Sequence, residues 1–214
     1  MIFSKLEYSH LKVCTMVSKS FIVLLEHPCF DKTLFRRGTP LENCKGITPV
    51  ESELYGRKIK NWVEIHPGFG RLWYSCTSKP EHKVIPDFSE ALPVREPVPL
   101  IATSAASEYV TMPALKRLKI KLTHYGTVHF KNEKGMTVGD VVKTVVGYFG
   151  TELPDGTMLS EVYGAFDSDD EDVSEDRPAT YGDAQGDHNA WHGIRGHTVS
   201  EDGTLTLLAD GYDS

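Results

Sequence analysis

The densest group of side chains able to bind a metal or move a proton lies near the C-terminal end of the sequence. On a helix, His188 and His192 would share one face, as two metal ligands require, and Asp183, Asp187 or His197 would complete the site. Without a metal, the same histidines beside a carboxylate could act as acid and base. The candidate catalytic residues are therefore His188, His192 and Asp187, and the candidate metal ligands are His188, His192 and His197.

Glycines in the same segment favour another interpretation. Gly186, Gly193 and Gly196 argue against a long helix. In a glycine-rich surface loop, the histidines would simply contact the surrounding carboxylates. No Glu follows His188 in the H-E-x-x-H manner, which excludes a zincin. The loop interpretation is therefore preferred to a metal or catalytic site.

Aromatic side chains form a second candidate site. Trp62 belongs to a predicted strand over residues 61–65, and Trp73 and Tyr74 to another over residues 71–76. The turn-forming residues between them predict a hairpin. Trp62, Trp73 and Tyr74 could line a groove that binds a planar ligand or a sugar, and the alternative is that they belong to the core.

Regular alternation marks the clearest strand of the sequence, over residues 117–122. Leu118, Ile120 and Leu122 alternate with basic residues, so one face should be buried and the other wet. A second strand is expected over residues 125–130, followed by a turn.

A capped helix should follow these strands. Thr137 and Asp140 form a capping-box variant, and valines then recur on one helical face as far as Phe149. The pattern predicts a helix over residues 138–149, with a shorter one over 159–166. A turn at Asp202-Gly203 predicts a final hairpin.

Other stretches carry weaker signals. Residues 20–26 predict a short buried strand or an apolar helical turn, and residues 31–56 predict a loop. Five prolines make residues 77–100 irregular.

Together the elements predict an α+β fold, mainly an antiparallel β-sheet with one or two packed helices. We expect a β-rich domain over residues 1–166, with the helix 138–149 packed on its sheet. Residues 167–177 should form an acidic loop. Residues 178–214 form an acidic, Gly- and His-rich C-terminal segment with the terminal hairpin, interpreted as part of the same domain.

Charge divides the sequence unevenly. Residues 151–214 hold 2 of the 23 Lys and Arg and 16 of the 30 Asp and Glu, a net charge of −14, which leaves +7 on residues 1–150. An acidic segment folding over a mildly basic body gains attraction. The sequence pI of about 5.7 and the scattered basic residues disfavour nucleic acid as a partner.

The remaining bulk features point to an ordinary intracellular protein. The cysteines fit neither a disulfide scaffold nor a common zinc motif. The longest apolar run near the N-terminus, residues 21–25, is too short to span a membrane, and no cleavable leader follows. We therefore expect a cytoplasmic address and no contact with a membrane.

A further pattern runs through residues 86–149. It consists of Ala102-Thr103, Pro113, Leu118-Lys119-Ile120, Tyr125, Val128, Gly135 and Thr137-Val138-Gly139-Asp140-Val141. With these residues the segment resembles a family known as the fungal (basidiomycete-type) domain of unknown function 6699. The resemblance implies a β-rich fold with a packed helix, and it implies no activity or catalytic residues.

Two functions remain open from the sequence. The preferred one is an intracellular fungal-type binding or interaction module, because no catalytic motif occurs and the charge asymmetry suits docking of a protein or small molecule. The alternative is an enzyme that uses His188, His192 and His197 for acid/base or metal-assisted chemistry on a small molecule. No cofactor is predicted, and a divalent metal belongs to the alternative only. The sequence leaves the oligomeric state open.

Overall fold

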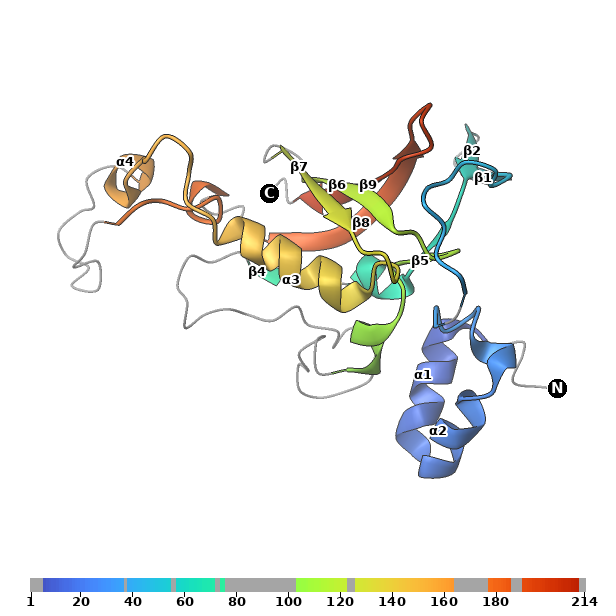
Figure 1. The fold of residues 1–214 in the computed structure, drawn as a ribbon. Helices are drawn as coiled ribbons and strands as arrows, with labels where there is room; N and C mark the ends of the chain where they lie inside the picture. Colours follow the sequence, from blue (N-terminus) through green and yellow to red (C-terminus); the bar gives the residue numbers. More distant parts are fainter. Residues whose placement is uncertain are drawn as a thin grey trace.

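The computed structural model describes residues 6–36, 38–54, 57–71, 74–75, 103–122, 126–163, 177–185 and 190–211. The predicted α+β architecture is confirmed, with mostly antiparallel sheets and a few helices (Figure 1). Among the described helices, none combines the length and apolar character needed to cross a membrane.

The largest sheet contains five described strands in the order β4-β8-β9-β6-β7. All neighbours in it are antiparallel except β6 and β9, which run parallel. Their bounds are β4 Tyr74–Ser75, β6 Arg117–Leu122, β7 Gly126–Lys131, β8 Ala190–Val199 and β9 Leu205–Gly211. Two small antiparallel pairs complete the strands: β1 Val50–Leu54 with β2 Arg57–Asn61, and β3 Glu64–Ile65 with β5 Thr111–Met112.

Helix α3 (Val138–Phe149) has the bounds that the sequence predicts. The capping box is present, since the Thr137 hydroxyl accepts from the Asp140 backbone N–H and the Asp140 carboxylate accepts from the Thr137 N–H. Its buried side chains include Val141, Val145 and Phe149, and they join one hydrophobic core with the inward residues of β6, β7 and β9. Helix α3 therefore lies along the sheet (Figure 1).

The C-terminal hairpin is also confirmed, because β8 pairs antiparallel with β9. Strand β9 inserts beside β6, so residues 205–211 lie in the middle of the sheet and not at its margin. Leu205 and Leu207 are fully buried, whereas Leu208 faces the opposite side and is half-buried. The acidic C-terminal segment thus contributes core strands to the basic body.

One predicted hairpin is wrong. The predicted strands 61–65 and 71–76 do not pair with each other, because β3 pairs with β5 and β4 pairs with β8. The intervening Pro67–Arg71 forms a 3-10 helix, η3, that packs against β8. The predicted loop over residues 31–56 also contains the strand β1, whose pairing with β2 gives a mostly exposed, charged ribbon.

Two helices precede the sheet, α1 (Tyr8–Val17) and α2 (Lys19–Leu25), and they form a pair beside the main body (Figure 1). Residues 20–26 therefore adopt the helical alternative. Only Leu25 of α2 is buried, so the alternative of a buried strand is wrong. Smaller elements are η2 Pro28–Phe30, η7 Ser104–Ser107, α4 Leu159–Tyr163 and η8 Asp183–Gln185. Helix α4 occupies part of the predicted helix 159–166, and residues 164–176, with nearly all of the acidic loop, lie outside the described residues.

Candidate functional site

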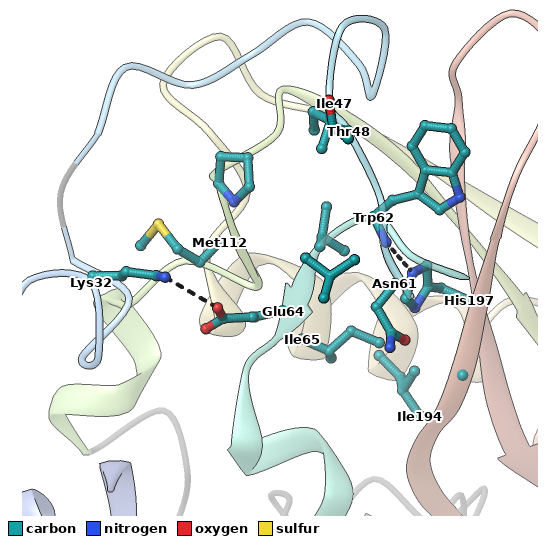
Figure 2. A pocket seen from close by; sticks show the side chains of 14 residues that line it. Lys32, Ile47, Thr48, Asn61, Trp62, Glu64, Ile65, Met112, Ile194 and His197 are labelled. Carbon is teal, nitrogen blue, oxygen red and sulfur yellow. Dashed lines mark hydrogen bonds and ion pairs between the residues drawn. The ribbon is translucent and has the colours of Figure 1, made fainter. Parts of the chain in front are cut away.

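An open cavity of about 870 Å³ lies where β3, β5 and β8 meet the chain around Thr48 (Figure 2). Its apolar lining comes from segments far apart in the sequence. Trp62 and Ile65 come from the region of β3, Met112 and Pro113 from β5 and its end, and Ile194 from β8. The volume falls within the range of small-molecule sites, about 300–1,000 Å³.

His197 lines the same cavity and is held by a backbone contact. The backbone N–H of Trp62 donates to His197 Nε2 at 3.2 Å. Because Nε2 accepts this hydrogen bond, the proton of the neutral ring resides on Nδ1. Burial lowers the pKa of His197, which favours that neutral form. The ring therefore offers one N–H donor in an otherwise apolar surrounding.

Charged and polar groups stand at the margin of the cavity. Lys32 forms an exposed ion pair with Glu64 at 3.4 Å, on the side away from His197 in Figure 2. Asn61 lines the cavity and donates its amide to the Ser52 hydroxyl. The arrangement is an apolar site with a polar margin, suited to orienting a ligand.

A buried polar cluster includes residues that adjoin the cavity strands β3 and β5 in the chain, and its centre is Glu108. One carboxylate oxygen, Oε2, accepts from the Tyr8 hydroxyl at 2.8 Å and contacts His66 Nε2 at 3.1 Å. The other oxygen, Oε1, accepts from Lys12 Nζ at 2.6 Å. Glu108 is 2% exposed and His66 fully buried, so these partners replace water almost completely.

The backbone sets the tautomer of His66. Its Nδ1 accepts from the Gly68 N–H at 3.1 Å, which leaves the proton on Nε2, facing Glu108. Lys12 donates a second hydrogen bond, to the Ser104 hydroxyl at 2.8 Å. The cluster therefore contains one buried cation, one buried anion and two neutral donors.

Burial and mutual contact move the pKa values of this cluster. Burial lowers the pKa of His66, although the Glu108 carboxylate acts in the opposite direction. Burial alone would raise the pKa of Glu108, but the hydrogen bond from His66 and the charge of Lys12 outweigh it and lower that pKa. Burial also lowers the pKa of Lys12, against the attraction of Glu108. Charged Glu108 is thus the form that the fold stabilises.

The cluster positions the cavity strands. His66 follows Ile65 of β3 directly, and its backbone N–H donates to the Val110 carbonyl just before β5. Tyr8 and Lys12 come from α1, so the Glu108 contacts attach α1 to both strands of the small β3-β5 sheet. The role we assign to the cluster is therefore positioning.

The structure brings together two of the residues that the sequence singled out, Trp62 and His197. His188, Asp187 and Trp73 lie outside the described residues. His192 lies in β8, and Tyr74 lies in β4, opposite Trp191 near the start of β8. The cavity instead lies along the later part of β8, at residues 194–197.

A helix through His188 and His192 was one possibility. For the described residues 190–199, which include His192, it is wrong, because they form a strand. The surface-loop alternative is wrong for the same residues. Pairing with the apolar β9 stabilises an extended backbone. The glycines lie where the register shifts, between Trp191 and Gly196, so β-bulges accommodate them within the strand. Asp183 is buried, and its carboxylate accepts from the Arg177 guanidinium and from Thr180. This carboxylate therefore serves the local fold.

Within the described part of the chain, no group of three or more His, Cys, Asp or Glu side chains is placed to hold a metal ion. The sequence reasoning missed Tyr8, Lys12, His66 and Glu108 altogether. The i, i+4 spacing of Tyr8 and Lys12 is the only local signal they carry, and it required knowing that residues 8–17 are helical.

The fold and this site define an α+β protein with an open, largely apolar cavity supported by a buried ionic cluster. Comparison of the chain with protein-family models, with curated proteins and with solved structures finds no match.

Proposed function

We propose that this protein is a binding module whose cavity takes a small ligand with a flat apolar body and a hydrogen-bond acceptor. The observation that supports the proposal is that Trp62, Met112, Ile194 and His197 all line one cavity of about 870 Å³. The apolar side chains would gain from displacing water. The N–H of His197 would orient the acceptor group of the ligand.

The buried cluster supports the same proposal. A binding site gains affinity when its walls are positioned before the ligand arrives. The Glu108 contacts join α1 to the strands of the cavity without placing a charge inside it. This arrangement suits recognition of a ligand in a preformed site.

We retain as a further proposal that the chain belongs to the fungal domain family that residues 86–149 resemble. The strand pair β6-β7 and the capped helix α3 agree with what the resemblance implies for the fold. One matching residue, Pro113, lines the cavity, but the resemblance assigns it no role and so does not bear on the ligand.

A substitution that fills the cavity tests the function. Thr48 is exposed and lines the cavity, so Thr48→Trp should obstruct it without disturbing the core. The probe is a set of aromatic fragments carrying a carboxylate or carbonyl, with binding followed by ligand-observed NMR. We expect fragments that bind the unmodified protein to lose about tenfold or more in affinity to this variant.

Thr144→Trp is the matched control, because Thr144 is exposed on the outer side of α3. It adds the same apolar surface away from the cavity and should leave fragment affinity within about twofold. Equal affinity for both variants, or no fragment bound by the unmodified protein, would contradict the proposal.

A further inference from the structure

The outward face of β6 and β7 is basic. Arg117, Lys119 and Lys121 alternate with buried apolar residues on β6, and His129 and Lys131 do so on β7. Residues directly opposite each other on paired strands share a face, and the register places Arg117 opposite Lys131 and Lys119 opposite His129. Basic residues therefore occupy directly opposite positions on this face.

Arg117 and Lys131 place like charges directly opposite each other, which is destabilising in a sheet. Ion pairs offset the charge only at one end of the strands. Arg117 contacts Glu42 at 2.6 Å, and Lys131 contacts Glu133 at 3.2 Å. Lys119 and Lys121 form no ion pair with a carboxylate in the described part of the chain. Hydrogen bonds from Ser200 and Thr204 lower the pKa of Asp202, and the charge of Lys119 contributes least to that shift, so both lysines remain available to a partner at the centre of the face.

The same face adjoins an open strand edge. β7 is the last strand of its sheet, and no described strand pairs with its other side. The Asn132 N–H donates to the Lys116 carbonyl, so the backbone N–H and C=O groups of Asn132 point toward β6. In an antiparallel pair this direction alternates, so the even-numbered residues of β7 direct these groups to β6 and the odd-numbered residues direct them away. Thr127, His129 and Lys131 therefore direct their backbone N–H and C=O groups to the open edge.

We propose that β7 and the adjoining basic face form a docking site for an extended acidic peptide segment of a partner protein. The peptide would add as a further strand beside β7, through the backbone groups of Thr127, His129 and Lys131. Its acidic residues, at every second position, would lie on the basic face. Successive strands lie about 4.8 Å apart, so the lysines of β6 are about 10 Å away, within reach of extended side chains.

Two observations favour a peptide over a nucleic acid or a lipid surface. The open edge offers backbone hydrogen bonds that only another polypeptide can complete in register. The described outward residues of β6 and β7 include no Phe, Tyr or Trp on which bases could stack. The basic face and the open edge of β7 are therefore complementary to an acidic peptide in extended conformation.

This site is separate from the proposed ligand cavity. His197 is opposite Leu207, which is buried in the core, whereas Lys119 is opposite Thr206 on the other face of the sheet. The cavity and the basic face therefore lie on opposite faces, and each site can fail without the other.

The test uses the full chain and a labelled synthetic peptide in which glutamate alternates with valine or threonine, with binding followed by fluorescence anisotropy. Lys119→Glu combined with Lys121→Glu should weaken binding about tenfold or more. The matched control is Lys60→Glu combined with Lys143→Glu, which makes the same change in net charge on exposed residues of β2 and α3. The control should retain affinity within about threefold.

A second peptide, N-methylated at every residue, keeps every charge but has no backbone N–H left to pair along either edge of a strand. We expect this peptide to bind about tenfold more weakly than its parent. Equal loss in both charge variants would show that only net charge matters and would overturn the proposal. It would also be overturned if the acidic peptide did not bind, while a single-stranded RNA or vesicles containing phosphatidylserine bound and lost affinity in the Lys119/Lys121 variant.

Discussion

At the scale of single residues, three buried side chains hold the Glu108 carboxylate. Tyr8, Lys12 and His66 all contact it, and none of the four side chains is more than 10% exposed. A buried ion pair adds little net stability but is costly to break, because removal of one partner leaves the other charge uncompensated. The cluster should therefore make the stability of the fold sensitive to protonation.

The direction of this sensitivity follows from the pKa shifts. The pKa of His66 is lowered below 6.5 by burial, so the unfolded chain binds a proton at this site before the folded chain does as pH falls. The pKa of Glu108 is also lowered in the fold, so its contribution is present above its unfolded pKa and is lost as pH falls through the folded pKa. The two groups therefore destabilise the fold in succession on acidification.

We predict that the free energy of unfolding falls between about pH 7 and pH 5, with His66 contributing up to about 1.4 kcal/mol for each pH unit. Urea unfolding across this range measures the slope. His66→Gln keeps an amide donor toward Glu108 but cannot titrate, so its slope should be shallower. An unchanged slope in this variant would show that other groups cause the dependence.

At the scale of elements, the backbones of η3 and β8 lie so close together at Gly193 that only a glycine fits there. Gly193 has φ +88°, and a Cβ placed there would lie 1.6 Å from the Phe69 carbonyl oxygen. Neither the dihedral angle nor the space admits a side chain. This glycine therefore fixes where η3 packs, and with it the segment that joins the cavity strand β3 to β4.

Gly193→Ala should cost about 3 kcal/mol or more of stability, because the backbone of β8 or η3 must move. Gly196→Ala on the same strand is the matched control, since a Cβ there meets nothing within 4 Å. It should cost no more than about 1 kcal/mol. Chemical denaturation of both variants measures the difference, and similar losses would contradict this account of the contact.

Elements with local signals could be predicted from the sequence, and those formed by distant pairing could not. Alternation gave the strand at residues 117–122, and the capping box gave the helix at 138–149. The strand β3 pairs with residues more than forty positions away, and its own two residues carry no periodic pattern. A local turn signal therefore led to a hairpin that does not form.

In the candidate site, too, residue types could be predicted from the sequence but contacts between distant residues could not. Trp62 and His197 could each be selected by residue type, but their contact joins residues 135 positions apart. In the cluster, Glu108 contacts Tyr8 and His66 across gaps of 100 and 42 positions. Single charged residues scattered along a sequence usually indicate solvated surface, so their burial could not be expected.

At the scale of the whole molecule, the C-terminal segment is part of the core. The inward residues of β9 lie between β6 and β8, and Leu207 is fully buried. The sequence suggested that the acidic segment lies over a basic body. In the structure, the strands β8 and β9 of the acidic segment lie in the middle of the largest described sheet.

Leu207→Ala should therefore destabilise the whole molecule by about 2–5 kcal/mol, as for a large-to-small change in a core. Leu208→Ala is the neighbouring control, because Leu208 lies on the outward face and is half-buried. It should cost less than about 1.5 kcal/mol. Circular dichroism during urea unfolding reports helices and strands together, and a transition confined to part of the signal would contradict a single core.

Methyl NMR of isotopically labelled protein decides whether the cavity beside His197 binds the ligand. An aromatic fragment should shift the methyl signals of Ile65, Met112 and Ile194, which line the cavity. It should leave Ile22, an exposed apolar residue of α2, unchanged. Shifts at Ile22 with none at the cavity methyls would show that fragments adhere to exposed apolar surface, and would contradict the claim.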